Sequence, residues 1–250
     1  MSDLILEQFR RLLDGLDPGD PWTELEQSGF LDLLRSEADG GAGLALAELF
    51  PLALEAGRRT QAPPVIETMV ARLRAPDAKG VADLEAALVS GGESSLAARS
   101  TAAAVDAALM AGAMERVQEM TLEYAMTRRQ FGREIAKFQA IQHQAAVMAE
   151  EVMAARMAAQ LAFVGAPLAI PPERAATAKA RAGQAAQTVC AIAHAVHGAI
   201  GISHEYPLHE LTGRLHRWRR AHGGEGYWAR KLGRAALSSG ADMVTLVRGV

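Results

Sequence analysis

The sequence predicts a mostly α-helical protein, with a small N-terminal helical domain followed by a C-terminal bundle of long helices. Two observations predict this fold class. Aromatic residues are only 5% of the 250-residue chain, whereas alanine, leucine and methionine are abundant, which favours helices over strands. Residues 100–129, 138–163 and 171–199 are helical patterns far longer than the usual helix of roughly 11–12 residues. Long helices with short links predict a four-helix-type bundle.

The N-terminal helical domain is expected to occupy residues 1–75. Apolar periodicity and turn residues predict helices at residues 3–16, 22–29, 44–59 and 65–73. The third of these patterns is nearly continuous in apolar residues, so we expect that helix to be buried on most sides.

A short connector, residues 76–99, is expected to join this domain to the bundle at residues 100–250. It carries a short helical pattern at residues 81–89 and ends in a Gly/Ser-rich stretch, residues 90–95, typical of a domain boundary. Two shorter helices, residues 205–220 and 225–239, follow the three long ones. Seven methionines of the long helices are expected to fill the bundle core: Met110, Met114, Met120, Met126, Met148, Met153 and Met157.

The overall composition indicates a cytoplasmic protein. A net charge of −3 indicates no nucleic-acid or membrane-surface partner. No apolar run reaches the roughly 18 residues of a membrane span, and the N-terminus has no basic region typical of a signal peptide. The lone Cys190 cannot form an internal disulfide, which fits a reducing compartment, and we expect it to pack as a small apolar residue.

The most informative segment is Met126 to Gln142, MTRRQFGREIAKFQAIQ. Gly132 ends one helical pattern and the Phe138-Gln139 step opens the next. This segment resembles the start of the C-terminal helical domain of acyl-CoA dehydrogenases. Residues 22–44, 52–64 and 197–209 are similar to further motifs of that family and follow in the family's order, which makes the resemblance specific.

The resemblance implies an activity and a cofactor. Members of this family dehydrogenate an acyl-CoA thioester between Cα and Cβ and pass the electrons to FAD. They normally carry a β-rich middle domain that covers one face of the flavin. The connector here is far too short for such a domain and lacks alternating strands, so the chain is identified as a short form without the β middle domain. Alone, it should not enclose FAD in the usual way.

The resemblance also implies a set of cofactor-binding residues: Arg128, Gln130, Phe131, Gln139, Gly198 and Gly201. In the family, the arginine and the following glutamine contact the FAD of the neighbouring subunit, since a guanidinium pairs bidentately with phosphate oxygens. The glycines would let the backbone approach the cofactor closely. The chain departs from the family at Ala195 and Ala199, which often are glutamine and glycine. The alternative is a tight helix–helix turn, with Arg128 solvated and Phe131 in the core.

For the catalytic base, the resemblance implies a glutamate before a glycine, at a fixed distance after the Glu205-Tyr206-Pro207 step. Counting without gaps places His222 there, whereas Glu225 precedes a glycine a few residues later. We take Glu225 as the candidate catalytic residue. The alternatives are that Glu225 merely stabilises a helix N-terminus and that His222 is solvated at a helix end. The family's other base position, residues 101–104, has no carboxylate, and Asp106 is the nearest acid.

No metal site is expected. His194 and His197 share a helix face at a spacing that can chelate metal, with His204 or Glu205 as a third ligand, but the family's glycine turn often has such a histidine without metal. No histidine follows a glutamate by three residues, as a di-iron bundle requires. A basic cluster at Arg214, Arg217, Arg219 and Arg220 is either a solvated face or a site for a phosphate-rich ligand.

Together these features predict an FAD-linked acyl-CoA dehydrogenase, or a subunit of one, acting on an acyl-CoA thioester. The retained cofactor arginine beside a missing cofactor cover predicts a dimer or a hetero-oligomer with a fuller acyl-CoA dehydrogenase subunit. The alternative is a non-catalytic helical scaffold that keeps the bundle and has lost the chemistry.

Overall fold

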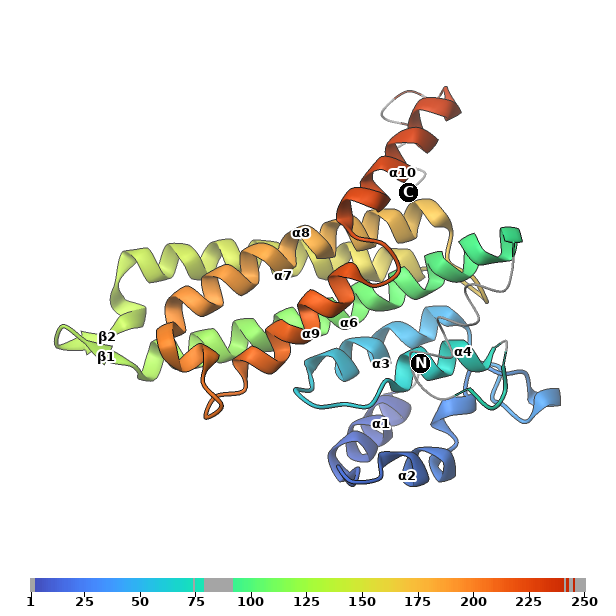
Figure 1. Cartoon of the computed structure of the whole chain (residues 1–250), viewed down its shortest axis with the longest axis horizontal. Coiled ribbons are helices and arrows are strands. Elements are labelled where there is room, and N and C mark those ends of the chain that lie inside the picture. Colours follow the sequence, from blue (N-terminus) through green and yellow to red (C-terminus); the bar gives the residue numbers. More distant parts are fainter. Residues whose placement is uncertain (1–2, 74, 79–91, 241, 243–244, 246–250) are drawn as a thin grey trace.

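A computed structural model describes residues 3–73, 75–78, 92–240, 242 and 245. The bundle consists of α6 (Gly92–Thr127), α7 (Gln139–Phe163), α8 (Pro172–His197) and α9 (Leu208–Arg220), which lie side by side (Figure 1). The N-terminal helices α1 (Asp3–Gly15), α2 (Pro21–Ser28), α3 (Leu46–Arg58) and α4 (Val65–Arg72) cover one side of the bundle, with α3 against α6. Helix α10 (Glu225–Ser239) packs against α8 and extends beyond the bundle (Figure 1). The mostly α fold with its C-terminal bundle is confirmed.

Strands are confined, among the described residues, to one antiparallel hairpin of β1 (Arg129–Gln130) and β2 (Arg133–Glu134). The described part of the chain therefore has no β middle domain. The helix expected at residues 81–89 lies outside the described residues. Helix α6 begins at Gly92 instead of residue 100, so the expected Gly/Ser-rich boundary partly belongs to this helix.

Helix α8 and the following turn, Pro172–Ile202, are long and apolar enough to cross a membrane by length and composition alone. A core helix of a bundle meets the same criterion. Here α8 packs against α6, α7 and α10, and it buries an alanine-rich face.

The bundle core contains only part of the expected methionine set. Met110, Met114, Met120 and Met148 are buried, whereas Met126, Met153 and Met157 are 59%, 57% and 56% exposed. The expectation is wrong for these three because periodicity shows which residues share a face, but not whether another helix covers that face. Cys190 is buried as expected, and this burial raises the pKa of its thiol to about 12.

Two glycines allow α3 and α6 to cross in backbone contact. A Cβ at Gly57 would lie 2.1 Å from the carbonyl oxygen of Leu109, and a Cβ at Gly112 would lie 1.9 Å from that of Leu54. Each glycine thus meets the backbone of the opposite helix, so no side-chain rotation relieves the clash. This reciprocal contact fixes the N-terminal helices on the bundle.

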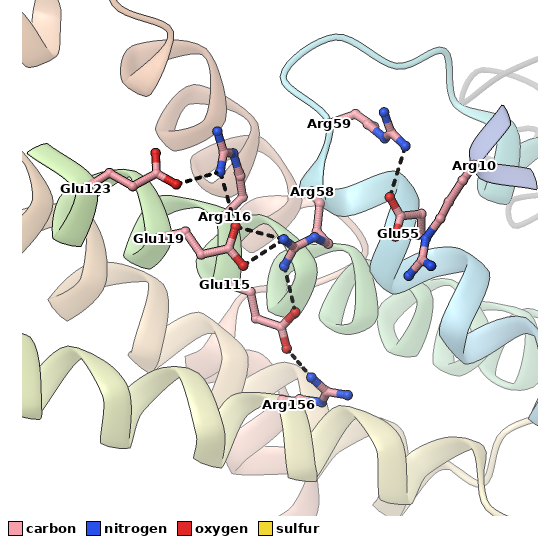
Figure 2. A network of polar contacts seen from close by, with 9 residues as sticks. All are labelled: Arg10, Glu55, Arg58, Arg59, Glu115, Arg116, Glu119, Glu123 and Arg156. Atoms are coloured by element: carbon pink, nitrogen blue, oxygen red, sulfur yellow. Dashed lines mark hydrogen bonds and ion pairs between the residues drawn. The ribbon is translucent and has the colours of Figure 1, made fainter. Parts of the chain in front are cut away.

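A network of ion pairs borders this crossing (Figure 2). Arg58 at the end of α3 donates hydrogen bonds to Glu115 (3.1 Å) and Glu119 (2.7 Å) of α6. Glu115 also accepts from Arg156 of α7 at 2.6 Å. Burial raises the pKa of Glu119, but the hydrogen bonds from Arg58 and Arg116 outweigh it and lower the pKa below its usual value. Because these groups are partly exposed, the network contributes modestly to stability, but it fixes the relative orientation of three helices.

Helix α4 buries a carboxyl group against α9. The indole Nε1 of Trp218 donates to Glu67 Oε1 at 3.3 Å, and the Glu67 residue is 5% exposed. Burial raises the pKa of the Glu67 carboxyl, because a charge in this apolar contact loses its hydration.

We expect Gly112→Ala to destabilise the protein by about 2 kcal/mol or more, because the added methyl group meets a backbone carbonyl that cannot move without shifting a helix. Urea unfolding measures the loss. Gly213→Ala in α9, where a Cβ meets nothing within 4 Å, is the matched control and should stabilise by about 0.5–1 kcal/mol. Equal stabilities for the two variants would contradict the close crossing.

We expect Glu67→Gln to be more stable than the wild type at pH 8 and equally stable near pH 4. A carboxyl with a raised folded-state pKa keeps its proton longer in the folded chain, so stability falls as the pH rises above the unfolded-state pKa of about 4.3. Glutamine keeps an acceptor for Trp218 without titrating. Thermal melting across this range provides the measurement, and exposed Glu24→Gln should show no such trend.

Candidate functional site

The hairpin β1–β2 carries the expected cofactor motif and projects from one end of the bundle (Figure 1). Its two turn residues, Phe131 and Gly132, have φ angles of 51° and 78°, as in a type I′ turn. Positive φ is strained for an aromatic residue, and the Phe131 side chain is nevertheless 90% exposed. The alternative in which Phe131 fills the core is therefore wrong. The sequence pattern predicted only a helix end here, and not a hairpin.

Arg128 lies between α6 and this hairpin. Its side chain is exposed, and the described part of the chain provides no hydrogen bond or ion pair for its guanidinium. Neighbouring Arg129, in contrast, pairs with Glu134 at 2.8 Å. Gln130 on β1 and Gln139 at the start of α7 are also exposed. The hairpin end thus presents a cation, two amides and an aromatic ring to solvent.

The expected glycine turn follows α8 as the 3₁₀ segment η4 (Gly198–Ile202). Gly198 has φ 63° and ψ −141°, a conformation that essentially requires glycine, and a Cβ there would meet nothing within 4 Å. A Cβ at Gly201 would lie 3.0 Å from His197 Cβ and 3.1 Å from Leu208 Cδ2. Packing within this chain therefore accounts for Gly201, whereas the backbone at Gly198 is open to a ligand.

A cluster of rings holds the hairpin end and the glycine turn together. Tyr124 in the last turn of α6 stacks on His197 of α8 at 4.5 Å, and His197 also packs against Tyr206 at 5.0 Å. The Arg128 backbone N–H donates to the Tyr124 carbonyl at 2.8 Å. Two segments about 70 residues apart in sequence thus meet at one end of the bundle.

The histidine pair of α8 is engaged in hydrogen bonds inside the bundle. His194 Nε2 bonds Thr212 at 3.0 Å, and His197 Nδ1 donates to the Ala193 carbonyl at 2.8 Å. No group of three or more potential ligands is arranged to hold a metal ion within the described ranges.

In the basic cluster, Arg214 is not solvated as a surface arginine would be: it is buried and lies over the Trp218 ring at 4.5 Å.

A second polar cluster lies inside the bundle, where Asp106 of α6 meets Lys179 of α8 and His222 of the α9–α10 link. Lys179 Nζ and His222 Nδ1 approach the same oxygen, Asp106 Oδ2, at 2.5 and 2.9 Å. The side chains of Lys179, Asp106 and His222 are 0%, 1% and 5% exposed. Burial lowers the pKa of the Lys179 ammonium, and Asp106 opposes this shift. The expectation of a solvated His222 is wrong.

Glu225, the candidate catalytic residue, is the first residue of α10 and pairs with Arg219 of α9. Arg219 Nε lies 3.1 and 3.2 Å from the two carboxylate oxygens, and Gln187 donates to Oε1 at 3.1 Å. The hydrogen bonds from Arg219 lower the pKa of Glu225 below its usual value. A carboxylate held in this way is a weaker proton acceptor than a free one.

Sequence reasoning missed the buried cluster of Asp106, Lys179 and His222, although the sequence carries a signal for part of it. Asp106 stands alone among the apolar residues of an alanine-rich helix, whereas Lys179 is followed two residues later by Arg181. A single charge in such a stretch indicates a buried partner, because unpaired buried charges are strongly unfavourable.

We expect Lys179→Met to lower the free energy of unfolding by about 3–5 kcal/mol, because Asp106 loses its buried counter-charge. The double variant Lys179→Met/Asp106→Asn should recover part of this loss, since it removes the unpaired charge. Urea unfolding of both variants tests the coupling. A loss below about 1 kcal/mol for the single variant would contradict a buried ion pair.

Comparisons with known proteins agree with this architecture. A family model described as "Acyl-CoA dehydrogenase, C-terminal domain" matches residues 100–236. The acyl-CoA dehydrogenase IpdE2 of Mycobacterium tuberculosis is 40% identical over 116 residues, which cover 46% of this chain and 35% of that protein. The curated relative is thus matched over about a third of its length.

Two solved structures are similar over nearly the whole chain. The ChsE4-ChsE5 complex from Mycobacterium tuberculosis contains a chain with a TM-score of 0.79 and 17% identity, matched over 96% of this chain and 99% of that one. A variant of the steroid ACAD Tcur3481-Tcur3483 has a TM-score of 0.74 and 20% identity, covering 95% and 94%. At these identities the likeness shows a shared fold.

Proposed function

Because the chain belongs to the acyl-CoA dehydrogenase family, we propose that it is a subunit of an FAD-linked acyl-CoA dehydrogenase, and that its hairpin end completes the FAD site of a partner subunit. The observation that carries this proposal is the exposed Arg128, which has no counter-charge among the described residues and stands beside an exposed aromatic ring.

The residues of the hairpin end fit one half of a dinucleotide site. Arg128 would hold the diphosphate as a bidentate donor, and Gln130 and Gln139 would supply further hydrogen bonds. Phe131 would pack on a flat or apolar part of the cofactor, and the open backbone at Gly198 would allow close approach. When bound, FAD supplies the acceptor for the electrons of the Cα–Cβ bond.

The rest of the cofactor site would come from a fuller acyl-CoA dehydrogenase subunit, with an acyl-CoA thioester as the substrate. The described residues include no β domain that would cover a flavin, and the half-site points away from its own bundle. The names of both similar structures give two proteins each, ChsE4 with ChsE5 and Tcur3481 with Tcur3483. These features favour a hetero-oligomer over an independent enzyme.

The test is co-expression with a candidate partner subunit, followed by measurement of bound flavin from the visible absorbance of the purified complex. We expect Arg128→Ala to weaken FAD binding at least tenfold, because a charge-assisted bidentate contact contributes about 1.5–3 kcal/mol. Arg230→Ala, an exposed arginine on α10, should leave flavin occupancy unchanged.

The outcomes separate the proposal from its rival. Stoichiometric flavin on this chain alone would contradict the need for a partner. A complex that binds FAD equally well with Arg128→Ala would favour the non-catalytic scaffold, in which the bundle only supports the assembly.

A further inference from the structure

We propose that a pocket between α9 and the N-terminal helical domain binds a monocarboxylate with an apolar body, and that Arg214 and Arg217 hold its carboxylate. The pocket has a volume of about 570 Å³, which is within the usual range of small-molecule sites. Its lining residues come from the end of α1 and the α1–α2 link, from the α3–α4 link, and from one face of α9. None of them belongs to the hairpin end or the glycine turn, so this inference does not rest on the proposed function.

The wall that the N-terminal domain contributes is mostly apolar. Six of its lining residues have hydrocarbon side chains, and three of these are prolines: Leu13, Leu16, Pro18, Pro21, Ala62 and Pro63. A proline ring fixes the φ angle, so this wall has little backbone freedom to lose when a ligand binds. The wall therefore suits the apolar part of a small molecule.

The opposite contribution, from α9, includes a buried cation. Arg214 is only 9% exposed, and its guanidinium lies over the Trp218 ring and donates a hydrogen bond to the Arg59 carbonyl. No carboxylate among the described residues forms an ion pair with it. Burial lowers the pKa of Arg214 to about 10, so the group is still charged at neutral pH. A buried charge without a counter-charge is strongly unfavourable, and an anion in the pocket would relieve this cost.

A second guanidinium adds to the positive charge. Arg217 lies one turn further along α9, also lines the pocket, and has no hydrogen bond or ion pair in the part of the chain that the structure describes. Its charge contributes to the lowered pKa of Arg214. Glu67 opposes this shift from a distance, but its carboxyl group accepts a hydrogen bond from Trp218 at 3.3 Å instead of pairing with the arginine. Two adjacent guanidinium groups of this kind match the two oxygens of a carboxylate.

A glycine keeps the pocket open on the α9 side. Gly213 lies inside the helix and lines the pocket, and a Cβ there would meet nothing within 4 Å. Its φ is not positive, so neither close packing nor backbone conformation requires glycine at this position. Glycine inside a helix lowers stability relative to alanine. A ligand that uses this space gives the glycine a function.

Two carboxylates among the lining residues favour a ligand with a single negative charge. Asp17 is exposed and accepts a hydrogen bond from the Gly19 N–H at 2.8 Å, and Glu210 accepts one from Gln61 at 3.3 Å. Both carboxylates thus have partners and do not require a cation. They would repel a phosphate dianion roughly twice as strongly as a monoanion. The phosphate-rich ligand considered for the basic cluster therefore fits less well than a monocarboxylate.

The test is calorimetric titration of the full chain with three acids: hexanoate, octanoate and phenylacetate. Three comparison compounds separate the contributions. Hexan-1-ol lacks the charge of hexanoate, 6-aminohexanoate adds an ammonium group to it, and inorganic phosphate lacks an apolar body. We expect saturable binding of at least one acid, and binding at least tenfold weaker for all three comparison compounds, because only the acids combine one negative charge with an apolar body.

Three variants locate the site. Gly213→Leu should abolish binding because its side chain fills the pocket, and it should fold because a Cβ at this position meets no neighbour. Arg217→Ala should weaken binding at least fivefold, since it removes a charge-assisted contact. Arg220→Ala, an exposed arginine of the same helix that does not line the pocket, is the matched control and should change the affinity by less than twofold. Thermal melting checks that each variant is folded.

Each contrary outcome overturns the assignment. These are no binding of any of the three acids at millimolar concentration, binding that survives Gly213→Leu, or binding of a comparison compound as tight as that of the acids. The flavin measurement with Arg128→Ala concerns other residues and another ligand, so failure of this inference is distinguishable from failure of the proposed function.

Discussion

The contact on which the rest of the structure depends is the crossing of α3 and α6 at Gly57 and Gly112. Each glycine faces a carbonyl of the opposite helix, so the two axes approach more closely than side chains would permit. This contact places Arg58 beside Glu115 and Glu119, and it sets the N-terminal helices against the longest helix of the bundle. The buried Asp106 cluster and the hairpin end both depend on α6, which carries Asp106 and leads into the hairpin.

Helix α6 also keeps the buried Asp106 cluster far from the hairpin end. Asp106 and Arg128 lie 22 residues apart on and just beyond α6, which corresponds to about 33 Å along a helix. In the proposed assembly the hairpin end of this chain serves a flavin held mainly by the partner, while the buried cluster lies inside its own bundle. This separation explains how the hairpin end can stay open while His222 is almost completely enclosed.

The long helices were predictable because alanine-rich periodicity is a local property of the sequence, and the family resemblance pointed to residues 126–142 as a cofactor motif without predicting their hairpin. The remaining features depend on tertiary contact. In the sequence, Gly112 only predicts a locally less stable helix. In the structure it is the residue at which α6 crosses α3. The hairpin at Phe131 is too short to show strand periodicity. Asp106, Lys179 and His222 come from three segments that are distant in the sequence. No local sequence pattern predicts that they lie in contact.

The exposed Phe131 ring has a thermodynamic consequence for association. Holding this residue at positive φ costs about 1–3 kcal/mol in every folded copy of the chain, whether or not anything touches the ring. The backbone that carries the ring is therefore already in its turn conformation before an encounter, and a second surface that covers the ring need not order this backbone. A rigid anchor of this kind converts most of its contact area into affinity, whereas a flexible loop would lose part of that gain to its own ordering.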